Sequence, residues 1–328
     1  MRTVPSDVPV PILGPAFERR QTPQSDPWWQ DSVVLCWWDA GNRIGGFHRI
    51  GHQPNLPDGP SVELSTNLFL ADRVLKRCEQ LPLREEDRRP DGFGCGDGSV
   101  RFAFTDHAIW RFAGEDVSGE LHVRNVHDPV DIYPKRGDVG ERIAAGHLEA
   151  AGRVTGELTV EGRRFAVDGA AIRDHGWGVR HWDEILVHRW LAVSFGEDAT
   201  VYAVSILTRS GQLADFGCVV RGDELAYADD LEIVTFLERD GVSHRGGTLR
   251  MRLATGEVVV LEAEPIQKGV VSWMARRAAI NDTICRFTWG DRVGYGDFET
   301  SNNPCAGATE PPVGLQAFVR DGLHHVRP

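Results

Sequence analysis

The sequence predicts an all-β protein built from antiparallel sheets that close into barrels or sandwiches. Three observations lead to this fold class. Short segments with alternating apolar and polar residues recur along the chain, and turns rich in glycine separate them. Strands do not alternate with long amphipathic helices, and neither GxGxxG nor GxxxxGK[ST] occurs, which disfavours a Rossmann fold or a TIM barrel. At 328 residues the chain exceeds one average domain, so we expect two domains, residues 1–145 and 146–328.

Composition narrows the class of protein further. The net charge of -12, without a basic run to offset it, weighs against nucleic acid and anionic membranes as partners. No apolar stretch approaches the ~18 residues of a membrane span. Residues 1–20 lack the pattern of a secretory signal, so a cytoplasmic location is expected. The six cysteines are scattered without a CxxC pair and are expected to be free thiols.

The first half of the chain begins with a proline-rich lead-in, residues 1–30, which Trp28 and Trp29 are expected to dock onto the body. Turn residues and loops rich in proline, glycine and charge separate the strands that follow. Residues 71–80 are ambiguous between helix and strand. The strands expected here are Ser32–Trp38, Arg43–Ile50, Ser61–Leu70, Ser99–Phe104, Ala108–Ala113 and Glu120–Val126.

The second half shows a clearer hairpin pattern. Glu161-Gly162 is a two-residue turn signature between two strands. Residues 270–280 are the one plausible helix of any length, and they are also compatible with a strand. The strands expected here are Arg153–Val160, Arg163–Val167, Leu186–Phe195, Thr200–Leu207, Thr248–Leu253, Val258–Ala263, Ile284–Trp289 and Gly294–Phe298.

The run RDHGWGVRHW, residues 173–182, concentrates ionisable, aromatic and glycine residues where a packing strand would carry aliphatic ones. Side chains alternate along a strand, so His175 and Trp177 share one face, and Asp174 and Arg180 lie on the other. His175 with Trp177 is therefore the pair expected to look into a cavity, and the glycines would let a ligand or a packed neighbour approach the backbone.

Structural roles are the competing interpretation of the same run. His175 would then be a satisfied buried imidazole and Trp177 a core residue. For Asp174 and Arg180, structural pairing is the favoured role. A metal site is not expected, because His175, His181 and His188 are too widely spaced along strands to share one ion, and neither HxH nor HExxH occurs.

The motif, preceded by a glycine-punctuated hairpin, resembles the DHxWG motif of the hydroxyneurosporene synthase (carotenoid 1,2-hydratase) family. Broader relatives are AttH-like and Diels–Alderase-like proteins. The segments 47–52 (FHRIGH) and 294–299 (GYGDFE) also resemble recurrent strands of an uncharacterised branch of that superfamily. The resemblance implies two consecutive lipocalin-like domains with a hydrophobic cavity near their junction.

Carried over by position, the resemblance implicates His175 and Trp177 in an active site, with a carboxylate elsewhere that protonates an alkene. Asp174 is included as a catalytic candidate, and Asp215 is a candidate for the acid only by its downstream position. Proton delivery to a C=C bond would give a carbocation, which the Trp177 ring could stabilise by about 1–2 kcal/mol. His175 could act as general acid or as the base that deprotonates water.

Other polar residues are candidates for substrate binding. His48 and His52 share a strand face, and Arg49 lies between them; exposed histidines in a hairpin are the simpler explanation. Tyr295 and Glu299 share a face of another strand and are a weaker candidate pair, for which a core tyrosine and a surface glutamate are the simpler explanation. Residues of the motif complete the set, which is His48, Arg49, His52, Arg180, His181, Tyr295 and Glu299.

Together these observations predict a cofactor-independent enzyme that hydrates, isomerises or cyclises a hydrophobic terpenoid, polyketide or aromatic compound by acid–base catalysis. The rival hypothesis is a non-catalytic carrier that only binds a lipophile in the same cavity. A third is an accessory stability factor with a filled interior. No cofactor or metal is expected. The oligomeric state stays open, with a homodimer among the alternatives.

Overall fold

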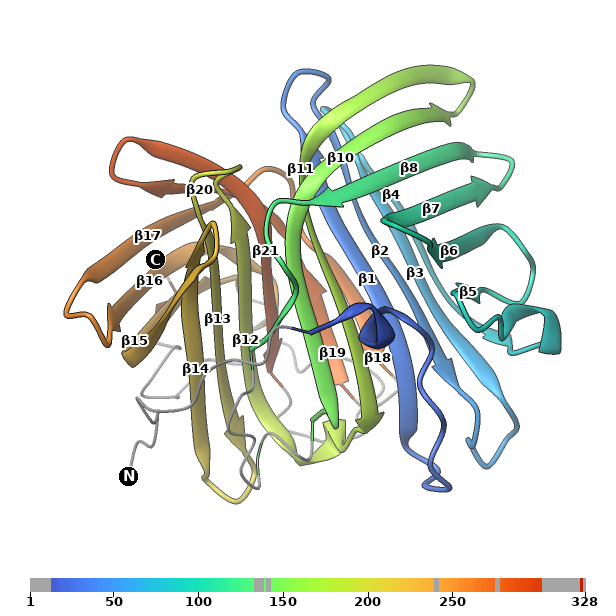
Figure 1. The fold of residues 1–328 in the computed structure, drawn as a ribbon, viewed down its shortest axis with the longest axis horizontal. Coiled ribbons are helices and arrows are strands. Elements are labelled where there is room, and N and C mark those ends of the chain that lie inside the picture. Colours follow the sequence, from blue (N-terminus) through green and yellow to red (C-terminus); the bar gives the residue numbers. More distant parts are fainter. Residues whose placement is uncertain are drawn as a thin grey trace. The chain divides into compact units, whose positions relative to one another are not determined.

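The computed structural model describes residues 13–132, 139, 143–238, 242–274, 278–302 and 325–326. These residues form two compact units, each built around one sheet (Figure 1). The described residues of the first unit fall in Pro11–Asp131 and Ala144–Arg180, and those of the second in Ile132–Ile143 and His181–Pro328. The predicted all-β class is confirmed, because strands dominate both units.

The first unit is an 11-stranded antiparallel sheet in the order β4-β3-β2-β1-β11-β10-β8-β7-β6-β5, with β9 beside β10. Its path is open at β4 and β5, so the strongly curved sheet is a half-barrel (Figure 1). Its strands are β1 (Trp29–Asp39), β2 (Ile44–Gln53), β3 (Ser61–Phe69), β4 (Val74–Pro82), β5 (Gly92–Gly94), β6 (Val100–Phe104), β7 (Ala108–Ala113), β8 (Val117–Asn125), β9 (Val130–Asp131), β10 (Gly146–Val160) and β11 (Arg163–Val179). The 3-10 turns η1 (Pro15–Glu18) and η2 (Glu85–Asp87) complete the unit.

Alternation along the strands divides the half-barrel into two faces. Val33, Leu35 and Trp37 of β1 point into a buried apolar cluster that Trp110 and Phe112 of β7 also join. Residues of the opposite parity on β1 are buried as well, although several are polar, such as Gln30 and Ser32. Both faces therefore hold buried side chains, polar ones included.

The hairpin of β10 and β11 carries the motif. Its turn is the predicted Glu161-Gly162, and both residues have positive φ (48° and 77°), as a two-residue turn of type I′ requires. The two strands pair from Val160 with Arg163 to Gly146 with Trp177. β11 also pairs along β1, from Trp38 with Ala170 to Trp29 with Val179.

Sequence order suggested that the strands from residue 146 onward belong to the C-terminal domain, whereas the sheet joins β10 and β11 to the strands before residue 132. The physical reason is the long-range pairing of β11 with β1, which places the motif strand in the middle of the first sheet. The division of the chain into two lipocalin-like domains at residue 145 stays a prediction.

The second unit is another 11-stranded sheet, in the order β12-β13-β14-β15-β16-β17-β20-β21-β19-β18, with β22 pairing β15. An additional pairing of β12 with β21 closes the strands from β12 to β17 with β20 and β21 into a barrel. Its strands are β12 (Ile185–Ser194), β13 (Thr200–Thr208), β14 (Leu213–Arg221), β15 (Glu224–Leu237), β16 (His244–Leu253), β17 (Val258–Pro265), β18 (Val270–Met274), β19 (Ala278–Asp282), β20 (Ile284–Trp289), β21 (Arg292–Asn302) and β22 (His325–Val326). The 3-10 turn η3 (Trp182–Glu184) precedes β12.

The barrel encloses its own apolar cluster, which includes Leu191, Val201, Leu249, Phe287 and Phe298. In the segment compatible with helix or strand, the described residues 270–274 and 278–280 lie in strands β18 and β19, which pair with each other. Ambiguous residues 71–80 likewise lie mostly in a strand, β4. Five described strands have no counterpart among the predicted ones: β5, β9, β14, β15 and β22.

Five cysteines lie among the described residues, and all five are free thiols, as predicted: Cys36, Cys78, Cys95, Cys218 and Cys285. Cys305, the last of the six, is outside the described residues. Among the described residues, no helix has the length and apolar character needed to cross a membrane.

Candidate active site

The motif occupies the C-terminal part of β11, between β1 and β10. The strand assignment places Arg173, His175 and Trp177 on one face and Asp174 and Gly176 on the other, as predicted. β11 ends at Val179, so Arg180 and His181 follow the strand instead of continuing its alternation.

His175 is buried and both of its ring nitrogens are engaged. Nδ1 lies 2.6 Å from the carbonyl oxygen of Phe17, and Nε2 lies 2.7 Å from Oδ1 of Asp31. Burial lowers the pKa of His175, but the charge of Asp31 and the hydrogen bonds to Asp31 and Phe17 outweigh it, so the pKa lies above its ordinary value. With an acceptor at each nitrogen, the ring donates twice and is an imidazolium.

Arg173 and Trp177, on the same face of β11 as His175, also contact the N-terminal segment that contains Phe17. Arg173 forms a buried ion pair with Glu18 of η1, with Nη1 2.7 Å from Oε2. The Trp177 ring stacks on Phe17, with ring centroids 5.8 Å apart. Since His175 also holds Phe17, the inward face of the motif binds a segment of its own chain. A substrate can reach the ring nitrogens of His175 only if Phe17 or Asp31 moves.

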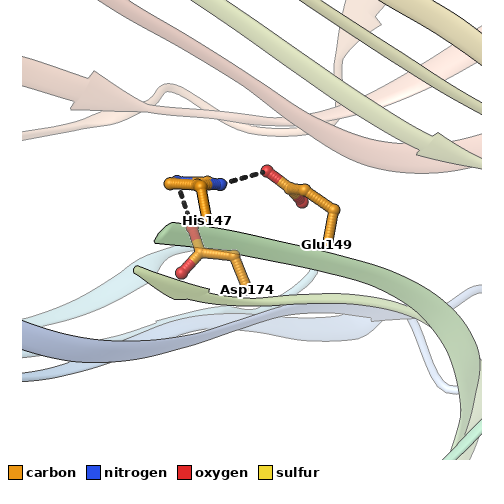
Figure 2. A group of neighbouring side chains, drawn as sticks. All are labelled: His147, Glu149 and Asp174. Carbon is orange, nitrogen blue, oxygen red and sulfur yellow. Dashed lines mark ion pairs between the residues drawn. The ribbon is translucent and has the colours of Figure 1, made fainter. Parts of the chain in front are cut away.

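The opposite face of the motif contributes to a second cluster, the His147 cluster, made of His147, Glu149 and Asp174. Glu149 on β10 pairs with Asp174 on β11, and His147 pairs with Gly176, so all three side chains emerge on the same face. Nδ1 of His147 is 3.3 Å from Oε1 of Glu149, and Nε2 is 3.8 Å from Oδ2 of Asp174. Figure 2 shows the imidazole between the two carboxylates.

Arg180 supplies a cation beside the His147 cluster. A Cβ atom added at Gly176 would lie 2.1 Å from Nη2 of Arg180 and 3.0 Å from Cδ2 of His147. The guanidinium therefore lies over Gly176 next to the imidazole, and glycine is required there for this close approach. Arg180 is itself buried. Asp174 and Arg180, for which structural pairing was predicted, thus both lie beside His147 in one cluster of ionisable groups.

The His147 cluster has the donor atoms of a metal site. One ligand atom from each residue lies within 4.8 Å of the others. The guanidinium of Arg180, however, adds a fixed positive charge beside them, which disfavours a divalent cation. The absence of a metal, predicted from the spacing of His175, His181 and His188, stays a prediction.

The candidates on β2 are buried and have intramolecular partners. Burial lowers the pKa of His48 to about 3 and the pKa of His52 to about 4. Nε2 of His52 donates to the carbonyl oxygen of Gly94, 2.8 Å away. Arg49, on the opposite face of the strand, pairs with Glu63 at 2.8 Å. The simpler explanation for the two histidines, exposure in a hairpin, is therefore wrong.

A cavity of about 400 Å³ lies in the first unit, between strands β3 and β4 and the hairpin of β7 and β8. Its lining includes Thr66, Leu68, Leu75, Phe112 and Val117. Thr66 and Phe112 also contact His48, whose Nδ1 is 2.8 Å from the Thr66 hydroxyl and whose ring is 4.7 Å from the Phe112 ring. His48 therefore lies directly behind this cavity, whereas the His147 cluster does not line it.

The remaining candidates belong to the second unit. Glu299 on β21 is mostly buried and pairs with Nδ1 of His188 on β12 at 2.8 Å. Trp182 of η3 packs edge-on against the same histidine, with ring centroids 6.0 Å apart. Tyr295 is half-buried on the same face of β21 as Glu299, and His181 is half-buried at the start of η3. The surface glutamate expected at position 299 is thus a buried member of an ion pair.

Sequence reasoning missed His147, Glu149, Asp31 and Glu18. For the first two a signal existed, because Gly146-His147-Leu148-Glu149 alternates as a strand does and places both ionisable residues on one face. Asp31 and Glu18 lie in the N-terminal part of the chain, and no local pattern connects them to residues 173–175.

Solved structures share this fold at low sequence identity. A crystal structure assigned as an AttH of Nitrosomonas europaea is 14% identical, with a TM-score of 0.63 over 85% of this chain and 94% of that one. CghA is 11% identical, with a TM-score of 0.60 over 86% and 90%. Kievitone hydratase of Nectria haematococca is 10% identical, with a TM-score of 0.56 over 92% and 96%.

These likenesses agree with the resemblance inferred from the motif, at the level of the fold. Curated protein sequences contain no match to this chain. One family model covers nearly the whole described region, from residue 14 to residue 304, and it is described as a domain of unknown function, DUF7064. The chain therefore belongs to the DUF7064 family.

Proposed function

We propose that this protein is an enzyme that hydrates, isomerises or cyclises a hydrophobic small molecule by acid–base catalysis, without a bound cofactor. The observation that carries the proposal is the His147 cluster, in which an imidazole lies between two carboxylates beside the guanidinium of Arg180. Ionisable groups brought together in a buried site are typical of general acid–base chemistry. The substrate class would be a terpenoid, a polyketide or an aromatic compound.

The exposed fractions of the three side chains suggest a catalytic role for each residue of the His147 cluster. The side chains of Asp174 and His147 are 13% and 8% exposed, whereas Glu149 is fully buried. Asp174 and His147 therefore face the substrate, and Glu149 orients the imidazole from behind. Arg180 stabilises the negative charge that remains on Asp174 after it has given up a proton.

The chemistry balances without an external reagent other than water. Protonated Asp174 gives its proton to one carbon of a C=C bond, and the other carbon becomes cationic. In hydration, water adds to that carbon and His147 accepts the proton that the water loses, then returns it to Asp174. In isomerisation, His147 instead removes a different proton from the cation. In cyclisation, a second double bond attacks it before the proton is lost.

The fold supports this substrate class. Both units enclose apolar clusters within curved sheets, an architecture that holds lipophilic ligands in small barrels. One of the similar structures is by name a hydratase, the kievitone hydratase of Nectria haematococca. That activity belongs to the other protein, and addition of water by this chain is part of our proposal.

Deuterium provides the test. Purified protein is incubated in D2O with kievitone and with a panel of prenylated aromatics and linear terpenes, and products are analysed by mass spectrometry. Hydration adds the mass of one D2O, and isomerisation exchanges one hydrogen for deuterium. Asp174→Asn and His147→Gln are expected to lower turnover at least ~100-fold, the usual contribution of a general acid or base.

A matched control lies on the same strand. Asp168 on β11 forms an exposed pair with Arg153, so Asp168→Asn removes a carboxylate six positions from Asp174 and leaves the cluster intact. This variant should keep wild-type turnover. If Asp174→Asn and His147→Gln stay active while His175→Ala loses turnover and still binds substrate, catalysis belongs to the face of His175 and Trp177 instead.

A carrier of lipophilic molecules is the second candidate function, and the cavity of about 400 Å³ favours it. A carrier would turn over none of the alkenes in the panel. Native mass spectrometry of the purified protein would then show an apolar ligand that has been retained through purification. Turnover by the wild-type protein, together with its loss in Asp174→Asn, would exclude this alternative.

A further inference from the structure

The cavity between β3, β4 and the β7–β8 hairpin has a mixed lining, in which the Thr66 hydroxyl lies among apolar side chains, Ser99 and four charged residues. Thr66 lines it together with apolar side chains, namely Leu68, Val74, Leu75, Val100, Phe112 and Val117. The charged residues of the lining are balanced, with Lys76 and Arg77 against Glu115 and Asp116. The cavity therefore offers no net charge to an ionised ligand.

Behind Thr66 a chain of hydrogen bonds has a fixed direction. The indole Nε1–H of Trp37 donates to Nε2 of His48 over 3.0 Å, because an indole nitrogen can only donate. Nε2 of His48 is therefore an acceptor and carries no hydrogen. Burial lowers the pKa of His48 to about 3, so at neutral pH the ring is neutral and its one hydrogen is on Nδ1.

That tautomer determines what the Thr66 hydroxyl can do. Nδ1–H of His48 donates to Oγ1 of Thr66, 2.8 Å away, so the hydroxyl oxygen is the acceptor in this contact. Its own hydrogen is then available for another acceptor, and Thr66 borders the cavity. A hydroxyl that accepts one hydrogen bond also becomes a stronger donor in the next.

Gly46 leaves space for the hydrogen-bonded rings of Trp37 and His48, which lie behind Thr66. A Cβ atom at this position would lie 2.4 Å from Nε2 of His48 and 2.6 Å from Nε1 of Trp37. Only glycine leaves the space that the two rings occupy. The glycine at position 46 thus makes room for the hydrogen bonds that link Trp37, His48 and Thr66.

We propose that this cavity is a binding site for a neutral, largely apolar small molecule with one hydrogen-bond acceptor, such as a ketone, and that the Thr66 hydroxyl donates to that acceptor. The cavity volume of about 400 Å³ lies within the range of roughly 300–1,000 Å³ for small-molecule sites. The apolar side chains of the lining provide affinity, and the Thr66 hydroxyl fixes the orientation of the ligand.

This site is separate from the His147 cluster. Thr66 pairs with His48, His48 with Leu35, and Leu35 with Arg173, so Thr66 belongs to the inward face of the sheet. Asp174 emerges on the opposite face of the same sheet. The proposal therefore holds whether or not the protein catalyses acid–base chemistry at the His147 cluster.

The test uses two probes of similar shape, 2-acetylnaphthalene and 2-isopropylnaphthalene, which differ in the carbonyl acceptor. Isothermal titration calorimetry measures the affinity of each for the wild-type protein and for Thr66→Val and Thr66→Ser. Thr66→Val, which keeps the shape of the side chain, should weaken the ketone roughly tenfold, as expected for one lost hydrogen bond in a buried site. The affinity of the hydrocarbon should not change, and Thr66→Ser should keep the ketone affinity within about twofold.

Two further variants locate the site and control for folding. Val117→Trp places a large ring in the lining and should abolish binding of both probes. Thr159→Val removes a hydroxyl from β10 outside the lining and should change neither affinity. The proposal is overturned if neither probe binds, if Val117→Trp binds both as the wild type does, or if Thr66→Val weakens both probes equally.

Discussion

His175 and Asp31 lie 144 residues apart in the chain, and their side chains form a buried ion pair with 2.7 Å between Nε2 and Oδ1. The pair joins β11 to β1, and the carbonyl oxygen of Phe17 completes the contacts of the imidazolium. A histidine at the centre of an unusual motif thus holds together two strands and the N-terminal segment. This contact gives the first prediction.

Asp31→Asn should lower the free energy of unfolding by about 3 kcal/mol at pH 6, because it removes the carboxylate from a buried cation. The pKa of His175 is raised in the folded protein, so stabilisation by the pair is complete below the unfolded pKa of about 6.5 and is lost as pH rises through the folded value. Urea unfolding of both proteins between pH 6 and pH 9 measures the difference. A difference that does not shrink toward high pH would contradict the protonated state of His175.

The ion pair of Arg173 and Glu18 leads to a second prediction. Both side chains are almost fully buried, and they connect β11 to η1. Glu18→Gln should cost about 3 kcal/mol in unfolding free energy, because the guanidinium stays buried without its counter-charge. Glu157→Gln is the matched control, since Glu157 pairs with Arg164 at the surface, where solvent screens the charges, and should change the unfolding free energy far less. Equal effects of both variants in urea unfolding would contradict the structural role of the N-terminal segment.

The buried neutral histidines predict that the unfolding free energy decreases at acidic pH. Burial lowers the pKa of His48 to about 3, and burial is also the main cause that lowers the pKa of His52 and of His244 to about 4. Below pH 6.5 the unfolded chain binds protons that these folded residues do not, so stability falls as pH falls toward the folded values. Each histidine contributes up to about 1.4 kcal/mol per pH unit.

His52→Gln tests this acid sensitivity with little change in contacts, because the glutamine amide can still donate to the carbonyl oxygen of Gly94. Its unfolding free energy should fall less steeply than that of the wild type between pH 6.5 and pH 5. The sign is opposite to that of His175, so the two variants separate the two contributions. An unchanged slope would mean that His52 is protonated in the folded protein.

Most of the fold was predictable because strand patterns are local. Alternation located Ala108–Ala113 and Ile284–Trp289 at the residues where β7 and β20 begin and end, and the Glu161-Gly162 turn placed a hairpin correctly. Segment 270–280 stayed ambiguous because a short apolar run has no clear period, and its pairing as β18 and β19 depends on partners across the sheet.

The candidate site was predictable only in part. Strand geometry separated His175 from Asp174 correctly, but it could not show which face meets other ionisable groups. Glu149 comes opposite Asp174 only because the register of β10 with β11 is set by a turn at residues 161–162. The partners of His175 lie in β1 and η1, and pairing over such a distance leaves no signal in the local sequence.

Gly176 of the motif and Gly146, which pairs with Trp177, provide the last prediction, because each leaves room for a different side chain. A Cβ atom at Gly146 would lie 1.9 Å from Cζ2 of Trp177, a rigid ring atom, whereas one at Gly176 would meet Nη2 at the flexible end of Arg180. Gly146→Ala should therefore displace the indole and cost roughly 1–3 kcal/mol in unfolding free energy, in the manner of an overpacked site. Gly176→Ala should lower the unfolding free energy less than Gly146→Ala does, because the guanidinium can swing away. It should lower the turnover rate more, because Arg180 then leaves the His147 cluster. Near-ultraviolet circular dichroism reports the indole, urea unfolding reports stability, and the D2O assay reports turnover. If Gly176→Ala kept full turnover with Arg180 displaced, the guanidinium would have no part in stabilising the charge on Asp174.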